Sequence, residues 1–211
     1  MATLAAVPVA DLPQRHAADW GRATRHPFLA AVRDGTVPEK VFDAWLVQDY
    51  RFVCDLLRFQ ARLLGRAPRT AQGVLVGGAA ALVDELTWFE QRAAARGCDL
   101  RVGPLPATAT YAALLERLDG EDFAVALAAL WALERVYLDA WSFAAPGAPA
   151  YQQFVEHWTA PQFAGYVEAL ESAADDALGD ATAGADLDAV FRQIVDAESR
   201  FWDMAWTGWA P

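Results

Sequence analysis

Apolar residues recur every three or four positions through almost the whole chain, the spacing that places side chains on one face of an α-helix. We find no segment between turns with the alternation of apolar and polar residues that is typical of a half-buried strand. The pattern therefore predicts an all-α protein.

Prolines and glycines divide this pattern into segments. His26-Pro27 predicts a bend in the first helix, Gly97 ends the third, and "PGAP" separates two later ones. The connection "GDATAG" (179–184) is too short for a domain linker, so residues 1–211 are predicted to form a single-domain helical bundle. The expected helices cover about 13–33, 38–66, 70–96, 111–118, 121–144, 150–158, 161–178 and 187–209.

Glu134 lies where the apolar face of its helix is expected. At about 100° per residue, a helical wheel surrounds it with apolar side chains and puts Arg135 and Asp139 on the opposite side. A glutamate needed only for solubility would lie with Arg135. Its neighbours on the wheel are Leu127, Leu130, Tyr137, Leu138 and Trp141.

Two other helices repeat this arrangement. Glu198 in the last helix and Asp49 in the second are both surrounded by aliphatic and aromatic residues, and Glu85 in the third is a weaker case because its helix is less amphipathic. Burying an unpaired ionised carboxylate costs several kcal/mol, so each acid must be paired, protonated, metal-bound or facing a polar cavity. A single inward acid is usually structural. Acids on separate helices, with few inward Lys or Arg, favour one shared site.

The composition narrows the classes of partner. The 211 residues include 17 Lys plus Arg and 28 Asp plus Glu, and the formal net charge of -11 opposes binding to nucleic acid and to anionic membranes. Two cysteines are too few for a disulfide framework, and no signal peptide or membrane-spanning run is apparent. We therefore expect a cytoplasmic protein that contacts neither nucleic acid nor membrane.

Acids in the core of a bundle could also bind two metal ions. The common di-iron bundle uses Glu-x-x-His pairs, but Pro13, Ala23 and Phe154 stand three residues before the histidines, so no metal is expected. A haem needs only one histidine, which His16 or His26 could supply. A cluster of acids is nevertheless a poor lining for a large apolar macrocycle.

Aromatic residues on these helices have two interpretations. They are core, which is their usual role, or they form the walls of a pocket for a flat ring. Rings beside acids suit a neutral or cationic heteroaromatic ligand, whose amino groups and protonated ring nitrogens donate to carboxylates. The residues concerned are Phe52, Tyr137, Trp141, Trp158 and Trp202.

Three segments resemble the TenA (thiaminase II-like) family, which has the haem-oxygenase-like helical fold. "HPFLAAVRDGTVPEKVFDAWLVQDYRFV" (26–53) is similar to the family's opening signature and "ALWALERVYLDAWSFA" (129–144) to its central helix. "AESRFWDMAW" (197–206) is similar to its final active-site helix. Together they make the resemblance span nearly the whole chain.

The resemblance implies a hydrolase of thiamin salvage that needs no cofactor. Its substrates would be aminopyrimidines such as 4-amino-5-aminomethyl-2-methylpyrimidine, converted to the hydroxymethyl compound and ammonia. Asp49 would bind the pyrimidine's amino group and ring nitrogen, Tyr137 would orient the site, and Glu198 would act as acid/base near the leaving amine. A homo-oligomer, dimer or tetramer, is also implied. The remaining expected substrate-binding residues are Phe52, Trp158, Trp141 and Glu85.

The sequence departs from the best-known branch of that family, whose central helix carries a catalytic cysteine. Leu133 stands at that position with Glu134 beside it, and Phe52 and Trp158 replace expected tyrosines. The chain thus resembles the Cys-lacking branch, in which glutamate is used. We expect Glu134 to activate water while Glu198 protonates the departing amine. Burial and mutual repulsion would separate their pKa values.

Two other functions stay open on the sequence. The first is an oxidase on the same fold, metal-dependent or cofactor-free, which the metal content of the purified protein would distinguish. The second is a non-catalytic small-molecule-binding or regulatory protein. A DNA-binding regulator should show a basic recognition helix, and the longest predicted helices have none.

Overall fold

The computed structural model describes residues 8–179 and 186–207, and all regular structure in these two ranges is helical. The all-α prediction is therefore confirmed. None of the helices described is long and apolar enough to cross a membrane. The elements are η1 (Val9–Asp11, 3-10), α1 (Leu12–Arg15), α2 (Ala17–Thr24), α3 (Pro27–Asp34), α4 (Glu39–Gly65), α5 (Arg69–Arg96), α6 (Pro106–Leu118), α7 (Phe123–Ala144), α8 (Gln152–Trp158), α9 (Pro161–Gly179) and α10 (Leu187–Thr207).

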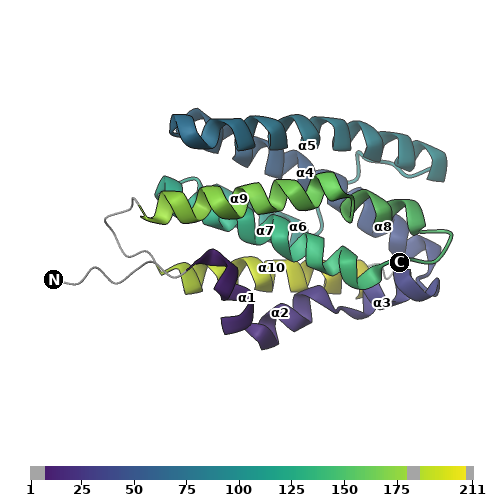
Figure 1. The fold of residues 1–211 in the computed structure, drawn as a ribbon. Helices are drawn as coiled ribbons and strands as arrows, with labels where there is room; N and C mark the ends of the chain where they lie inside the picture. The colour runs from purple at the N-terminus through teal and green to yellow at the C-terminus, as the bar shows by residue number, and fades with distance from the viewer. Residues whose placement is uncertain (1–7, 180–185, 208–211) are drawn as a thin grey trace.

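The helices pack around α7, which contacts α9, α10, α2 and α3 (Figure 1). The long helices α4 and α5 pack against each other at the top of this view, and α9 lies across the front of α7. Helix α10 lies below and contacts α2, α6 and α7. Most side chains of α7 are buried, as the apolar "FAVALAALWALERVYLDAW" requires. This central helix carries Glu134 into the middle of the bundle.

The prediction of one bent helix over residues 13–33 is wrong, because the structure divides this segment into α1, α2 and α3. His16 and Arg25 leave the helical region, with ψ angles of 36° and 39°. Pro27 begins α3 instead of bending a continuous helix, since His26 is extended and caps the new helix. The His26 Nδ1 atom accepts a hydrogen bond from the Phe28 amide at 3.1 Å.

Other boundaries follow turn chemistry. Gly97 ends α5 in the left-handed region, at φ 70°, as its position predicts. Helix α6 begins at Pro106, five residues before the predicted start at Tyr111, because extended Leu105 and a proline at the first position initiate it. The predicted last residue of the final helix, Trp209, and nearly all of "GDATAG" lie outside the described residues.

Candidate active site

A small cavity lies where α4, α5, α7, α8 and α9 meet. Its volume is about 20 Å³, which is room for about one water molecule. No Lys or Arg is among its lining residues, all of which lie in the described ranges. The lining consists of Asp49, Phe52, Val53, Leu56, Leu82, Glu85, Leu133, Glu134, Tyr137, Trp158 and Phe163.

Only one of the two carboxyl oxygens of Asp49 has a hydrogen-bond partner in the described part of the protein. Its side chain is buried on α4, and the Tyr137 hydroxyl donates a hydrogen bond of 2.6 Å to Oδ2. The other oxygen, Oδ1, is buried with no hydrogen-bond partner in the described part of the protein. A buried unsatisfied oxygen is rare and costs free energy, so it marks a position where a ligand donor would be stabilising.

Glu198 repeats this geometry on α10. The Tyr111 hydroxyl donates to its Oε2 at 3.2 Å, while Oε1 is buried without a partner among the residues described. Glu198 does not itself line the 20 Å³ cavity, but it lies close enough to raise the pKa values of Asp49 and Glu134. Tyr111 is absent from the site residues predicted from the sequence, because its role depends on a contact between α6 and α10 that the pattern of one helix does not indicate.

Burial raises the pKa values of all four acids above their ordinary values. It raises the pKa of Glu134 to about 8, with repulsion from Glu85 and Glu198 adding to the effect. It raises the pKa of Glu198 to about 8 and that of Glu85 to about 7, against the lowering effect of hydrogen bonds from Tyr111 and Trp158. The pKa of Asp49 is also well above its ordinary value, chiefly because of burial. Near neutral pH Glu134 and Glu198 are therefore mostly protonated, whereas Glu85 is close to half-ionised.

Glu85 and Trp158 form one wall of the cavity. The Trp158 indole nitrogen donates a hydrogen bond of 2.7 Å to Glu85 Oε1, which links α8 to α5. Trp158 is buried, whereas the Glu85 residue is only half-buried. This pair therefore lies between the cavity and the surface.

The remaining predicted site residues divide into two groups. Phe52 lines the cavity and packs on Tyr111, with ring centroids 4.6 Å apart. Trp141 does not line it but stacks behind Trp158, at 4.7 Å. Trp202 stacks on Tyr137 in the same way, at 6.0 Å. The structure thus places Trp141 as a support for the wall and Phe52 in the wall itself.

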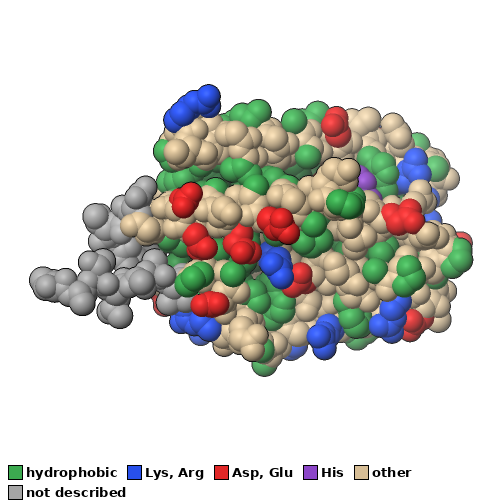
Figure 2. Space-filling view, viewed as in Figure 1, with side chains coloured by type: hydrophobic (Ala, Val, Ile, Leu, Met, Phe, Trp, Pro, Cys, Tyr) green, Lys and Arg blue, Asp and Glu red, His purple; other side chains and the backbone are tan. Residues whose placement is uncertain are grey.

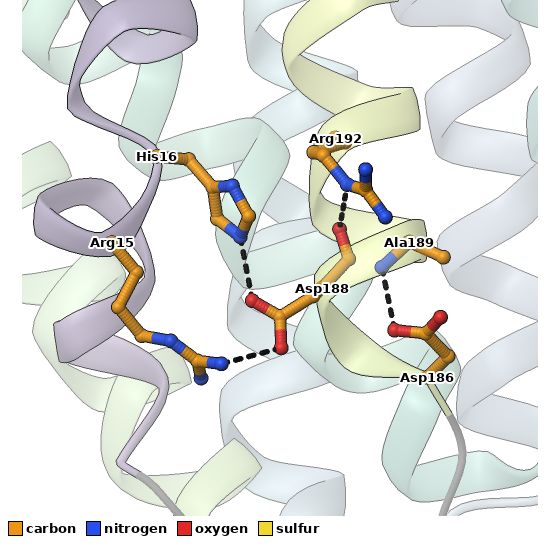
Figure 3. Close-up of polar contacts among 6 residues, drawn as sticks. All are labelled: Arg15, His16, Asp186, Asp188, Ala189 and Arg192. Atoms are coloured by element: carbon orange, nitrogen blue, oxygen red, sulfur yellow. Dashed lines mark hydrogen bonds and ion pairs between the residues drawn. The ribbon is translucent and has the colours of Figure 1, made fainter.

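The two histidines considered for haem have other partners. His16 points from the N-terminal helices to α10, where its Nε2 lies 2.6 Å from Asp188 Oδ1 beside Arg15 (Figure 3). His26 uses both ring nitrogens, one as the α3 cap and one 3.1 Å from Asp203. Within 8–179 and 186–207, no group of three or more His, Cys, Asp or Glu side chains is placed to hold a metal ion.

This helical arrangement defines the class of the protein, the haem-oxygenase-like fold. A domain of unknown function from Shewanella denitrificans, described as having a heme oxygenase-like fold, superposes with a TM-score of 0.74. The two chains are 16% identical, and the match covers 96% of this chain and 94% of that one.

The family is defined by the sequence: the chain belongs to the TENA/THI-4/PQQC family, which matches residues 14–208. It is 31% identical over 206 residues to a probable bifunctional TENA-E protein of Glycine max, covering 91% of this chain and 90% of the relative. The structure of a TenA homologue from Pyrococcus furiosus is also similar, with 26% identity, a TM-score of 0.87, and coverage of 94% of this chain and all of the other. The resemblance stated from three sequence segments is thereby confirmed.

Proposed function

We propose that this protein is an aminopyrimidine aminohydrolase of thiamin salvage, which releases ammonia or an amine from an amino- or aminomethylpyrimidine. One observation carries the proposal. Asp49 and Glu198 each present one oxygen to a tyrosine and keep a second, buried oxygen without a partner in the described structure, close to the cavity that Glu134 lines. Family membership and the similarity to a probable TENA-E protein support the same class of reaction.

In this proposal Asp49 recognises the pyrimidine edge. Burial raises the pKa of Asp49, which favours the protonated form. A protonated carboxyl can donate one hydrogen bond to a ring nitrogen, while its carbonyl oxygen accepts another from the adjacent amino group. Tyr137 fixes the orientation of the carboxyl from behind. Phe52 and Trp158, which both line the cavity, would supply apolar surface for a flat ring.

Glu134 and Glu198 would share the acid and base roles. Neighbouring buried carboxyls do not ionise together readily, so one proton leaves first and the pair then holds one base and one acid. The ionised Glu134 takes a proton from water, and the water oxygen bonds to the carbon that carries the leaving amine. The C–N bond breaks, and its electron pair takes the proton of Glu198, which gives the alcohol and a neutral amine.

The direct test is to incubate the purified protein with a panel of aminopyrimidines and to assay released ammonia. We expect hydrolysis of 4-amino-5-aminomethyl-2-methylpyrimidine, and loss of it in the Glu134→Gln, Glu198→Gln double variant. Asp196→Asn on α10 is the matched control, since that carboxyl is exposed and ion-paired with Arg200. Ammonia release from no member of the panel would contradict the proposal.

A further inference from the structure

A second, larger pocket lies directly outside the acidic cavity. It has a volume of about 840 Å³ and opens between α5 on one side and α8 and α9 on the other. Figure 2 shows hydrophobic side chains gathered along the seam between α5 and α9 on this face of the molecule. We call this space the outer pocket. Its wall includes Val74, Gly77, Ala81, Trp88, His157 and Ala169.

Only one layer of side chains separates the outer pocket from the acidic cavity. Glu85, Trp158 and Phe163 line both spaces, so they form the partition. A hydrogen bond from the Trp158 indole to Glu85 joins two of its members. Phe163, in the first turn of α9, is half-buried. Because the inner cavity has room for about one water molecule, some of its lining side chains must move before a pyrimidine can bind there.

The chemistry of the outer pocket selects what can occupy it. Trp88 and His157 stack with centroids 4.3 Å apart and nearly parallel planes, which makes a flat aromatic wall. Burial lowers the pKa of His157, so this ring is neutral near pH 7. The other ionisable residues in the wall are Asp84, Glu85 and Tyr166. The lining residues, which all lie in the described ranges, include no Lys or Arg. Such a wall favours flat, neutral or cationic groups and disfavours anions.

We propose that the outer pocket is the leaving-group subsite, so that the substrate spans the partition with its pyrimidine in the acidic cavity and its amine substituent between α5 and α9. The inference rests on the proposed function and deepens it, because it names the substrate class. The substituents accepted are flat or apolar and uncharged or cationic. Leaving groups that carry a phosphate or a carboxylate are excluded.

Gly77 offers a specific way to fill the outer pocket. A Cβ built there meets no atom within 4 Å, and leucine has a better helix propensity than glycine, so Gly77→Leu should fold. The same substitution at Gly73, one turn earlier on α5, is the matched control. Gly73 is equally open but does not line the outer pocket. Thermal unfolding of both variants checks that they fold.

The test is calorimetric binding of three probes to the native protein and to both variants. The probes are 4-amino-5-aminomethyl-2-methylpyrimidine and two derivatives that carry a benzyl or a 4-carboxybenzyl group on the nitrogen of the aminomethyl substituent. We expect Gly77→Leu to weaken binding of the benzyl compound at least tenfold and to leave the parent pyrimidine within about twofold. Gly73→Leu should bind both like the native protein. The carboxybenzyl compound should bind the native protein at least tenfold more weakly than the benzyl compound.

Three results would overturn the subsite: equal effects of Gly77→Leu on the parent and benzyl compounds, no effect on the benzyl compound, or no binding of the benzyl compound to the native protein. Equal affinity for the benzyl and carboxybenzyl compounds would overturn the charge selection. Binding does not require turnover. If the native protein binds these compounds as expected but releases no ammonia from the parent, the proposed function fails while the subsite stands.

Discussion

Replacing Glu134 by glutamine should change how the stability of the protein depends on pH. Burial raises the pKa of Glu134 from 4.5 to about 8, so between these values the folded state binds more protons than the unfolded state. When folding raises the pKa of an acid, the contribution of that acid to the unfolding free energy is greatest below the unfolded pKa, here 4.5, and falls as pH rises towards the folded pKa of about 8. At about 1.4 kcal/mol per pH unit, the loss between pH 5 and pH 8 is about 3 kcal/mol.

Glutamine has nearly the same shape and does not titrate, so Glu134→Gln should lack this loss. The assay is urea unfolding followed by tryptophan fluorescence at several pH values from 5 to 8, for the native protein and the variant. Their difference in unfolding free energy should grow in favour of the variant by about 3 kcal/mol over this range. Glu116→Gln, on the exposed face of α6, is the control and should follow the native protein. Identical pH dependence of native protein and Glu134→Gln would refute the reasoning that this acid is buried and protonated.

Three further variants test contacts in and around the site. Tyr137→Phe removes the hydrogen bond to Asp49. This should lower kcat/KM for the aminopyrimidine about tenfold without changing the thermal midpoint by more than a few degrees. An unchanged kcat/KM would show that this contact does not orient Asp49. Gly78→Ala should destabilise the protein by about 1–3 kcal/mol, because its Cβ would lie 2.3 Å from the Tyr166 hydroxyl. Gly73→Ala, where space is open, should stabilise it by up to about 1 kcal/mol. Equal unfolding free energies for these two glycine variants would contradict the close packing at Gly78.

The inward placement of the acids could be predicted because it follows from helical periodicity. Asp49, Glu134 and Glu198 all lie on the apolar stripe of their helices, and all three are buried. Glu85 was the weakest expectation, and it is the acid that remains half-buried. The spacing along one helix is therefore enough to place a side chain on a face, since 3.6 residues per turn fixes that face before any tertiary contact forms.

What could not be predicted depends on contacts between helices. The hydrogen bond from Tyr111 to Glu198 joins residues 87 apart in sequence, and no pattern within α6 indicates it. The break at His16 is also not marked by proline or glycine, and its ring contacts Asp188 on α10. Phe163, at the start of α9, separates two cavities whose existence depends on five helices. Periodicity determines faces, whereas partners and cavities are set by how the faces assemble.

The proposed acid and base roles are tested most directly by the single-turnover rate of ammonia release from 4-amino-5-aminomethyl-2-methylpyrimidine. We predict that Glu134→Gln and Glu198→Gln each lower this rate by a factor of about 100 or more, while Asp196→Asn keeps the native rate. Native rates in both glutamine variants would contradict the claim that these two buried carboxyls perform the chemistry.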